Sequence, residues 1–239
     1  MICIDSHGYS MSLNSPWLPP SISAKPHAGS LQYSAAVGEL PPTDDLFPML
    51  LREAQELDQR AAELKRKGGL SEATDLYKRT LSLLRDALGP HHLAVAAELG
   101  KLAALYRAER RFPDAERAFD DSLEILEKAV GPEHIAIAVT LSNLGMLDLD
   151  QSRYADAEVL VLRAVAMLQR LVGPEDAALA AVTNNLALVY ENSGRYEDAE
   201  ACYQRSLKLL ENKLPSDHPA IGQVLANLAR LHRKQDEKS

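Results

Sequence analysis

Apolar residues follow the three-to-four-residue spacing of amphipathic helices from about residue 46 to the end of the chain. Glycine and proline interrupt this pattern at short intervals, as at Gly68-Gly69 and Gly89-Pro90. The intervening turns are short, so consecutive helices must lie antiparallel and adjacent. The pattern therefore predicts an all-α chain with helices at about 46–67, 71–88, 92–109, 113–130, 134–151, 155–172, 176–193, 197–213 and 218–235.

The same helical pattern returns every 42 residues, in columns that keep their character. They are a leucine column (Leu102, Leu144, Leu186, Leu228), two small columns (Ala61, Ala103, Gly145, Ala187, Ala229 and Ala73, Ala115, Ala157, Ala199) and a large one (Tyr77, Phe119, Val161, Tyr203). Small residues let helix axes approach closely, and stacked pairs bury faces that one pair leaves open. We expect a repeat domain at 46–239, with four helix pairs and a C-terminal capping helix at about 46–88, 92–130, 134–172, 176–214 and 218–235.

Residues 1–45 have no helical or alternating period and are rich in serine, proline and glycine. We expect this segment to be disordered or irregular. Trp17 and Tyr33 could form a short docking motif or fold back onto the repeats, and either Met1 or Met11 could be the start. Prolines at 16, 19 and 20 interrupt its longest uncharged stretch, so we expect no membrane insertion.

The charge and cysteine content limit which classes of partner and which compartment we expect. The net charge is −8 and the pI about 5.4. A nucleic-acid-binding protein normally presents a basic face, so we expect no nucleic-acid partner. The two cysteines, Cys3 and Cys202, lie in different kinds of segment and read as free thiols in a reducing compartment. This predicts a cytoplasmic location.

The repeat columns carry a family resemblance. The two small columns are spaced by twelve residues, with a large, often aromatic residue four further on, as in TNNLALVYENSGRYEDAEACYQRSLKLLE, and the linkers read GPEH and SDHP. This pattern resembles the tetratricopeptide repeat of the kinesin light chain and nephrocystin-3 type, over about residues 50–235. The resemblance implies a right-handed α-α superhelix, a tetratricopeptide-repeat solenoid, that serves as a non-enzymatic scaffold or adaptor.

In that family the first helix of each pair lines a concave groove. The resemblance therefore places a polar column in the groove, where an amide can both donate to and accept from a peptide backbone. The same residues could instead bond adjacent helices. The family's terminal-carboxylate clamp is not reproduced, since Gly100, Ala104 and Ala181 stand at clamp positions. The expected peptide-binding residues are Gln59, Lys101, Asn143, Asn185 and Asn227, with Asn184, Arg107 and Arg230 beside them.

Other candidate chemistry is weak. His92, His134 and His218 share one linker position, but one histidine per repeat is too widely spaced to share a metal ion, so we expect them to start helices. No catalytic motif, metal site or cofactor site is expected. The leading hypothesis is a protein that binds a peptide or partner helix in its groove. The alternative is a structural subunit that assembles homo- or hetero-oligomers through the solenoid ends. The sequence leaves the oligomeric state open.

Overall fold

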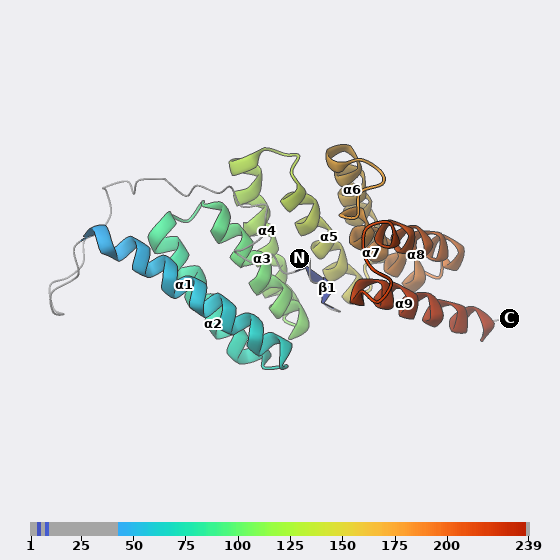
Figure 1. The fold of residues 1–239 in the computed structure, drawn as a ribbon, viewed down its shortest axis with the longest axis horizontal. Coiled ribbons are helices and arrows are strands. Elements are labelled where there is room, and N and C mark those ends of the chain that lie inside the picture. The colour runs from blue at the N-terminus through green and yellow to red at the C-terminus, as the bar shows by residue number, and fades with distance from the viewer. Residues whose placement is uncertain (1–3, 6–7, 10–42, 238–239) are drawn as a thin grey trace.

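A computed structural model of the chain describes residues 4–5, 8–9 and 43–237. These residues form two short strands and nine helices, and the helices stack side by side along one axis (Figure 1). β1 (Ile4–Asp5) pairs antiparallel with β2 (Gly8–Tyr9), and β2 lies against α5. The helices are α1 (Thr43–Arg66), α2 (Leu70–Leu88), α3 (Leu93–Ala108), α4 (Phe112–Val130), α5 (Ile135–Asp150), α6 (Tyr154–Val172), α7 (Leu179–Asn192), α8 (Tyr196–Glu211) and α9 (Pro219–Asp236).

The predicted all-α architecture is confirmed over residues 43–237. Consecutive helices pack as pairs, α1 with α2 through α7 with α8, and the second helix of each pair packs against the first helix of the next. The pairs stack into one continuous array, with α1 at one end and α9 at the other (Figure 1). Trp17, Tyr33, Cys3 and Met11 lie outside the described residues, so the expectations about them remain open.

Helix boundaries follow the sequence pattern except at α1 and α7. α1 begins at Thr43, three residues before the expected start, and carries Pro48 inside it. α7 begins only at Leu179, because Asp176 first makes a tighter turn. The Asp176 carboxylate accepts from the Ala178 N–H at 2.8 Å, and its carbonyl accepts from the Leu179 N–H at 3.1 Å.

The small columns mark the close helix crossings, as the sequence predicted. Ala61, Ala103 and Ala187 are fully buried. At Gly145 a Cβ atom would lie 2.5 Å from Val161 Cγ2, so α5 and α6 approach more closely there than alanine permits. Ala229 is the exception, because it is exposed on α9, the last described helix, where no further helix packs.

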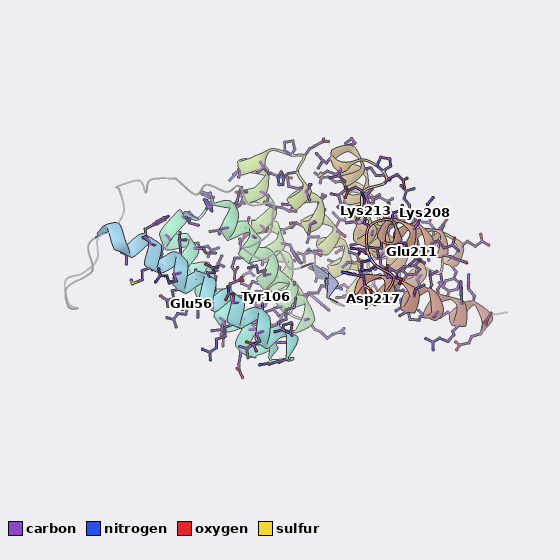
Figure 2. The ribbon with its side chains drawn as sticks, in the orientation of Figure 1. Glu56, Tyr106, Lys208, Glu211, Lys213 and Asp217 are labelled. Carbon is purple, nitrogen blue, oxygen red and sulfur yellow. The ribbon has the colours of Figure 1, made fainter. Side chains whose placement is uncertain are left out.

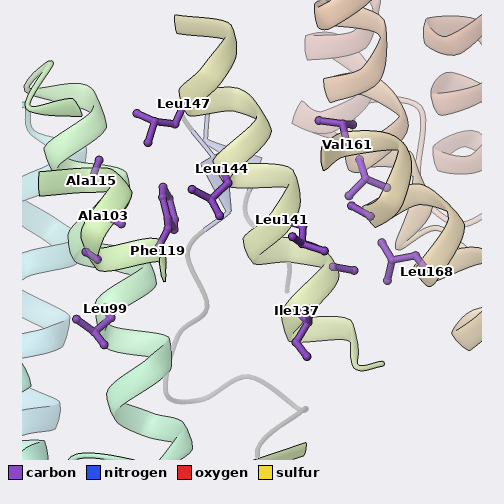
Figure 3. Packing of buried hydrophobic residues seen from close by; sticks show 14 of the residues in the cluster. Leu99, Ala103, Ala115, Phe119, Ile137, Leu141, Leu144, Leu147, Val161 and Leu168 are labelled. Carbon is purple, nitrogen blue, oxygen red and sulfur yellow. The ribbon is translucent and has the colours of Figure 1, made fainter. Parts of the chain in front are cut away.

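The large column fills the space between neighbouring pairs. Tyr77, Phe119 and Tyr203 are all at most 1% exposed. Figure 3 shows the Phe119 ring between Ala103 of α3 and Leu144 of α5. These contacts join into one continuous core from α1 to α9. Charged side chains such as Glu56 and Glu211 lie at the surface (Figure 2).

The three repeated histidines begin helices, which confirms their predicted role. The Nδ1 atoms of His92, His134 and His218 accept from the backbone N–H two residues later, at 3.1, 3.1 and 3.2 Å. Each bond satisfies an N–H group that the helix itself leaves without an acceptor. Within residues 43–237, no helix combines the length and the apolar character needed to cross a membrane.

Candidate functional site in the row of first helices

The polar column predicted from the sequence lies on α1, α3, α5, α7 and α9, which we call the first-helix row. Members of this row also contact each other directly, α3 with α5 and α5 with α7. The residues expected to bind a peptide differ in exposure. Gln59 is exposed, Arg107, Asn185 and Arg230 are half-buried, and Lys101, Asn143, Asn184 and Asn227 are buried.

Three of these side chains donate hydrogen bonds that form a ladder between successive first helices. Lys101 Nζ bonds to Asp58 Oδ1, Asn185 Nδ2 donates to Ser142 Oγ at 3.0 Å, and Asn227 Nδ2 donates to Asn184 Oδ1 at 2.9 Å. In every case the donor lies 43 residues after its acceptor. We call this set the polar ladder. These bonds match the alternative that the sequence left open, in which the column links adjacent helices, and peptide binding by these residues remains a prediction.

The polar ladder is interrupted between α3 and α5. The residue 43 positions before Asn143 is Gly100, which has no side chain to bond. Asn143 is only 5% exposed, and its buried Oδ1 atom has no hydrogen-bond partner among the described residues. A Cβ atom added to Gly100 would meet nothing within 4 Å. The first-helix row thus contains both a buried acceptor without a partner among the described residues, Asn143 Oδ1, and a ladder position without a side chain, Gly100.

Lys101 is committed to a buried charge cluster. Its ammonium group bonds to Asp58 of α1, donates to Glu98 Oε2 at 2.9 Å, and lies 5.7 Å from the ring centre of Tyr77. The Lys101 side chain is 3% exposed and that of Glu98 is fully buried. Burial raises the pKa of Glu98 to about 7, and Asp58 adds to the rise while Lys101 opposes it. One ammonium thus faces two carboxyl groups, one of which is partly protonated near neutral pH.

A second charge cluster attaches α9 to α7 and α8. The fully buried carboxylate of Glu191 accepts from Tyr203 Oη at 2.8 Å, from Arg230 Nη2 and Lys234 Nζ at 2.8 Å each, and from Arg230 Nε at 3.0 Å. Burial alone would raise the pKa of Glu191, but hydrogen bonds from Arg230, Lys234 and Tyr203 outweigh it and hold the pKa at about 2. Arg230 is therefore engaged in holding the last helix.

Arg107 takes part in a similar link between α3 and α5. Its Nε atom donates to Asp150 Oδ2 at 2.6 Å. Arg107 and Asp150 are separated by 43 residues, as are Glu191 and Lys234, where the charges are reversed. Asp58, Glu98 and Glu191 were missed from the sequence. The lysine partners of Asp58 and Glu191 lie 43 residues away, and Glu98 lies only three residues from Lys101, but its burial depends on how the helices pack. A search for opposite charges 43 residues apart would have found two of them.

Comparison with known proteins agrees with this geometry. The family model of the tetratricopeptide repeat matches residues 60–128, 96–170 and 176–239. The fold is similar to a crystal structure from Podosopora anserina, described as a kinesin light chain with nearly identical TPR-like repeats, at 20% identity and TM-score 0.60, over 77% of this chain and 87% of that one.

BtubC (BKLC) from P. vanneervenii is similar at 20% identity and TM-score 0.61, over 80% of this chain and 83% of that one. No curated protein sequence matches the chain. At such identities the solved structures show a shared fold, and the family model covers most of the sequence. The chain therefore belongs to the tetratricopeptide repeat family, with the repeat fold of the kinesin light chain type.

Proposed function

We propose that this protein is a non-enzymatic scaffold that binds an extended peptide of a partner protein along the first-helix row. Tetratricopeptide repeats generally mediate protein–protein interaction and are typically non-enzymatic. In the family this row lines the concave groove. The observation that carries the proposal is the interruption of the polar ladder. Asn143 Oδ1 has no partner among the described residues, and Gly100, the ladder position 43 residues earlier, has no side chain and open space around it.

A peptide backbone suits this position chemically. Each residue of an extended peptide carries an N–H donor and a C=O acceptor, and the Asn143 amide offers the complementary groups. A buried acceptor without a partner costs roughly 1–3 kcal/mol, so a ligand that supplies an N–H recovers that cost on binding. Gln59 is exposed and Asn185 half-buried on the same row, so both are placed to contribute further contacts.

The remaining predicted residues have a supporting role in this proposal. Lys101, Asn227 and Arg230 are engaged with neighbouring helices, and Arg107 is engaged with Asp150. These links fix the spacing of the first helices before any partner arrives. A surface that is already ordered loses less conformational entropy on binding. The contact residues we propose are Gln59, Asn143 and the half-buried Asn185, whose Nδ2 atom also donates to Ser142.

The test compares two substitutions of glycine by asparagine. Peptides would be selected from a displayed random library against the wild-type chain, and the affinity of the best binder measured by calorimetry. Gly100→Asn places an amide beside Asn143 and should weaken binding about 10-fold, the value of roughly one hydrogen bond. Gly222→Asn is the control, because a Cβ atom at that helical glycine also meets nothing within 4 Å and it lies outside the ladder.

Asn143→Ala should lower the affinity for the same peptide by a similar factor, while the helical circular dichroism signal stays unchanged. Equal affinity for wild type, Gly100→Asn and Asn143→Ala would reject binding at the interrupted position. An affinity that falls only in Gly222→Asn would also reject peptide binding at the interrupted position. In that case the groove contacts would have to be sought on another part of the array.

Assembly through the solenoid ends is the second candidate, and one observation favours it. On α9, Leu225 is 48% exposed and Ala226 and Ala229 are exposed beside it. At the other end, Met49 on α1 is also 48% exposed. These exposed apolar residues could pack against another subunit. Leu225→Glu should then lower the mass measured by light scattering, and an unchanged mass would count against end-to-end assembly.

A further inference from the structure

We propose that a second copy of this chain docks on the outward face of α6, in an antiparallel pair of α6 helices related by a two-fold axis. This surface is separate from the first-helix row and from the solenoid ends. Five large hydrophobic residues are exposed among the described residues, and three of them are on α6. They are Val159 (66% exposed), Leu162 (42%) and Leu171 (40%).

An apolar stripe runs along the exposed side of α6. Ala155, Val159, Leu162 and Ala166 follow one another at spacings of four, three and four residues, so they lie on one face of the helix, and all four are exposed. The equivalent positions of the other second helices are mostly polar or charged. They are Ser71, Asp75, Lys78 and Ser82 in α2, Pro113, Arg117, Asp120 and Glu124 in α4, and Glu197, Ala201, Gln204 and Lys208 in α8.

The order of residues in the stripe is symmetric, which points to a second copy as the occupant. Ala155 and Ala166 are equally distant from the point between Leu160 and Val161, and so are Val159 and Leu162. An antiparallel copy centred on that point places alanine against alanine and Val159 against Leu162. A two-fold interface requires such self-complementarity, because each contact occurs twice with the partners exchanged. The alanines at both ends of the stripe let the two helix axes approach closely.

The charges beside the stripe are self-complementary as well. Asp156 and Arg163 are seven residues apart, so they lie on the same side of the stripe two turns from each other, and both are exposed. Their midpoint is one residue from the centre of the apolar stripe. In the antiparallel pair, Asp156 of each helix therefore lies beside Arg163 of the other. Neither residue makes an ion pair within the described part of the chain, so both are available to a partner.

A contact made by one helix on each side is small, so the dimer should be weak and depend on concentration. The mass of the chain would be measured by sedimentation equilibrium from low micromolar to submillimolar concentration. Leu162→Glu should raise the dimer dissociation constant by about 10-fold or more, because it brings a carboxylate against an apolar surface. The residue is exposed, so the helical signal and the melting temperature should stay near wild type.

A charge exchange separates self-association from binding of a different partner. Asp156→Arg alone and Arg163→Asp alone should each weaken the dimer, because each brings like charges together. The double variant restores opposite charges between the copies and should recover the wild-type dissociation constant. Leu225→Glu on α9 is the matched control and should leave it unchanged.

Three results would overturn the proposal. The first is a wild-type chain that stays monomeric at every concentration, whatever other protein binds α6. The second is a dimer that Leu225→Glu weakens and Leu162→Glu does not, which assigns assembly to the solenoid end. The third is a double charge variant that is no better than the two single variants, which excludes the antiparallel register.

Discussion

The amide of Asn227 donates to the side-chain oxygen of Asn184 at 2.9 Å and so joins α9 to α7 across 43 residues of sequence. The same offset connects Asn185 to Ser142 and Lys101 to Asp58. A hydrogen bond that recurs at one offset fixes the register of each first helix against the previous one. A buried amide satisfied in this way costs little, whereas an unsatisfied one is expensive. The interruption at Gly100 therefore leaves one buried atom of the row, Asn143 Oδ1, without a hydrogen-bond partner among the described residues.

Completing the polar ladder should stabilise the chain. Gly100→Asn supplies the missing side chain, and the space around Gly100 is open. We expect the free energy of unfolding to rise by about 1 kcal/mol, from one hydrogen bond and from replacing a glycine inside a helix. Urea denaturation monitored by circular dichroism measures this change.

A separate control measures how much of this stabilisation comes from replacing a glycine inside a helix. Gly222→Asn makes the same replacement inside α9, where the ladder has no gap, and should raise the free energy of unfolding by only a few tenths of a kcal/mol. If Gly100→Asn in an Asn143→Ala background keeps its full advantage, the gain does not come from a bond to Asn143.

The sequence predicted the apolar columns well, because they depend on the helical period and on side-chain volume. Gly145 was expected to mark a close crossing, and Val161 does lie against it. The buried polar contacts were harder to predict from the sequence. A lysine is normally exposed, and the burial of Lys101 follows only from the register between α1 and α3. The late start of α7 depends on the turn that the Asp176 carboxylate makes, and this aspartate stands where three other repeats carry histidine.

The Lys101 cluster should make stability depend on pH through Glu98. The pKa of Glu98 is about 7 in the folded chain, against an ordinary value of 4.5. The folded state therefore holds this proton more tightly, and unfolding releases it between these two values. The free energy of unfolding should fall as pH rises through that window, by on the order of 3 kcal/mol. Glu98→Gln removes this dependence, because its amide stays neutral throughout.

The measurement is a series of urea unfolding curves from about pH 4.5 to about pH 7.5, which brackets the window of this group. The difference in stability between Glu98→Gln and wild type should shift in favour of the variant as pH rises. The exposed Glu127→Gln is the control and should keep a constant difference from wild type. Parallel pH curves for Glu98→Gln and wild type would show that Glu98 does not titrate in this range.

Removing the charge of Glu191 should loosen the last helix. Glu191→Gln leaves Arg230 and Lys234 facing a neutral amide. Because these cations are 40% and 42% exposed, water compensates part of the lost charge, and we expect a loss of about 1.5–3 kcal/mol from the weakened hydrogen bonds. Hydrogen exchange should show the amides of α9 opening first. The folded pKa of about 2 lies below the ordinary 4.5, so the wild-type stabilisation is present above about pH 4.5 and is lost as pH falls towards 2. Exposed Glu211→Gln should have no such effect, and equal exchange rates in α9 for wild type and Glu191→Gln would contradict the role of this cluster.

The crossing of α5 and α6 should not tolerate a methyl group. In Gly145→Ala the new Cβ atom would lie 2.5 Å from Val161 Cγ2 and 3.1 Å from the Ala157 carbonyl oxygen. Val161 is fully buried and the carbonyl belongs to the α6 backbone, so neither can move without shifting a helix. We expect a loss of about 1–3 kcal/mol, measured by urea unfolding, although alanine favours the helix intrinsically. Gly222→Ala meets nothing within 4 Å and should instead gain about 0.5–1 kcal/mol. The opposite signs of the two changes in the free energy of unfolding separate the effect of packing from that of helix propensity. A gain in stability at both positions would contradict the close approach of α5 and α6 at Gly145.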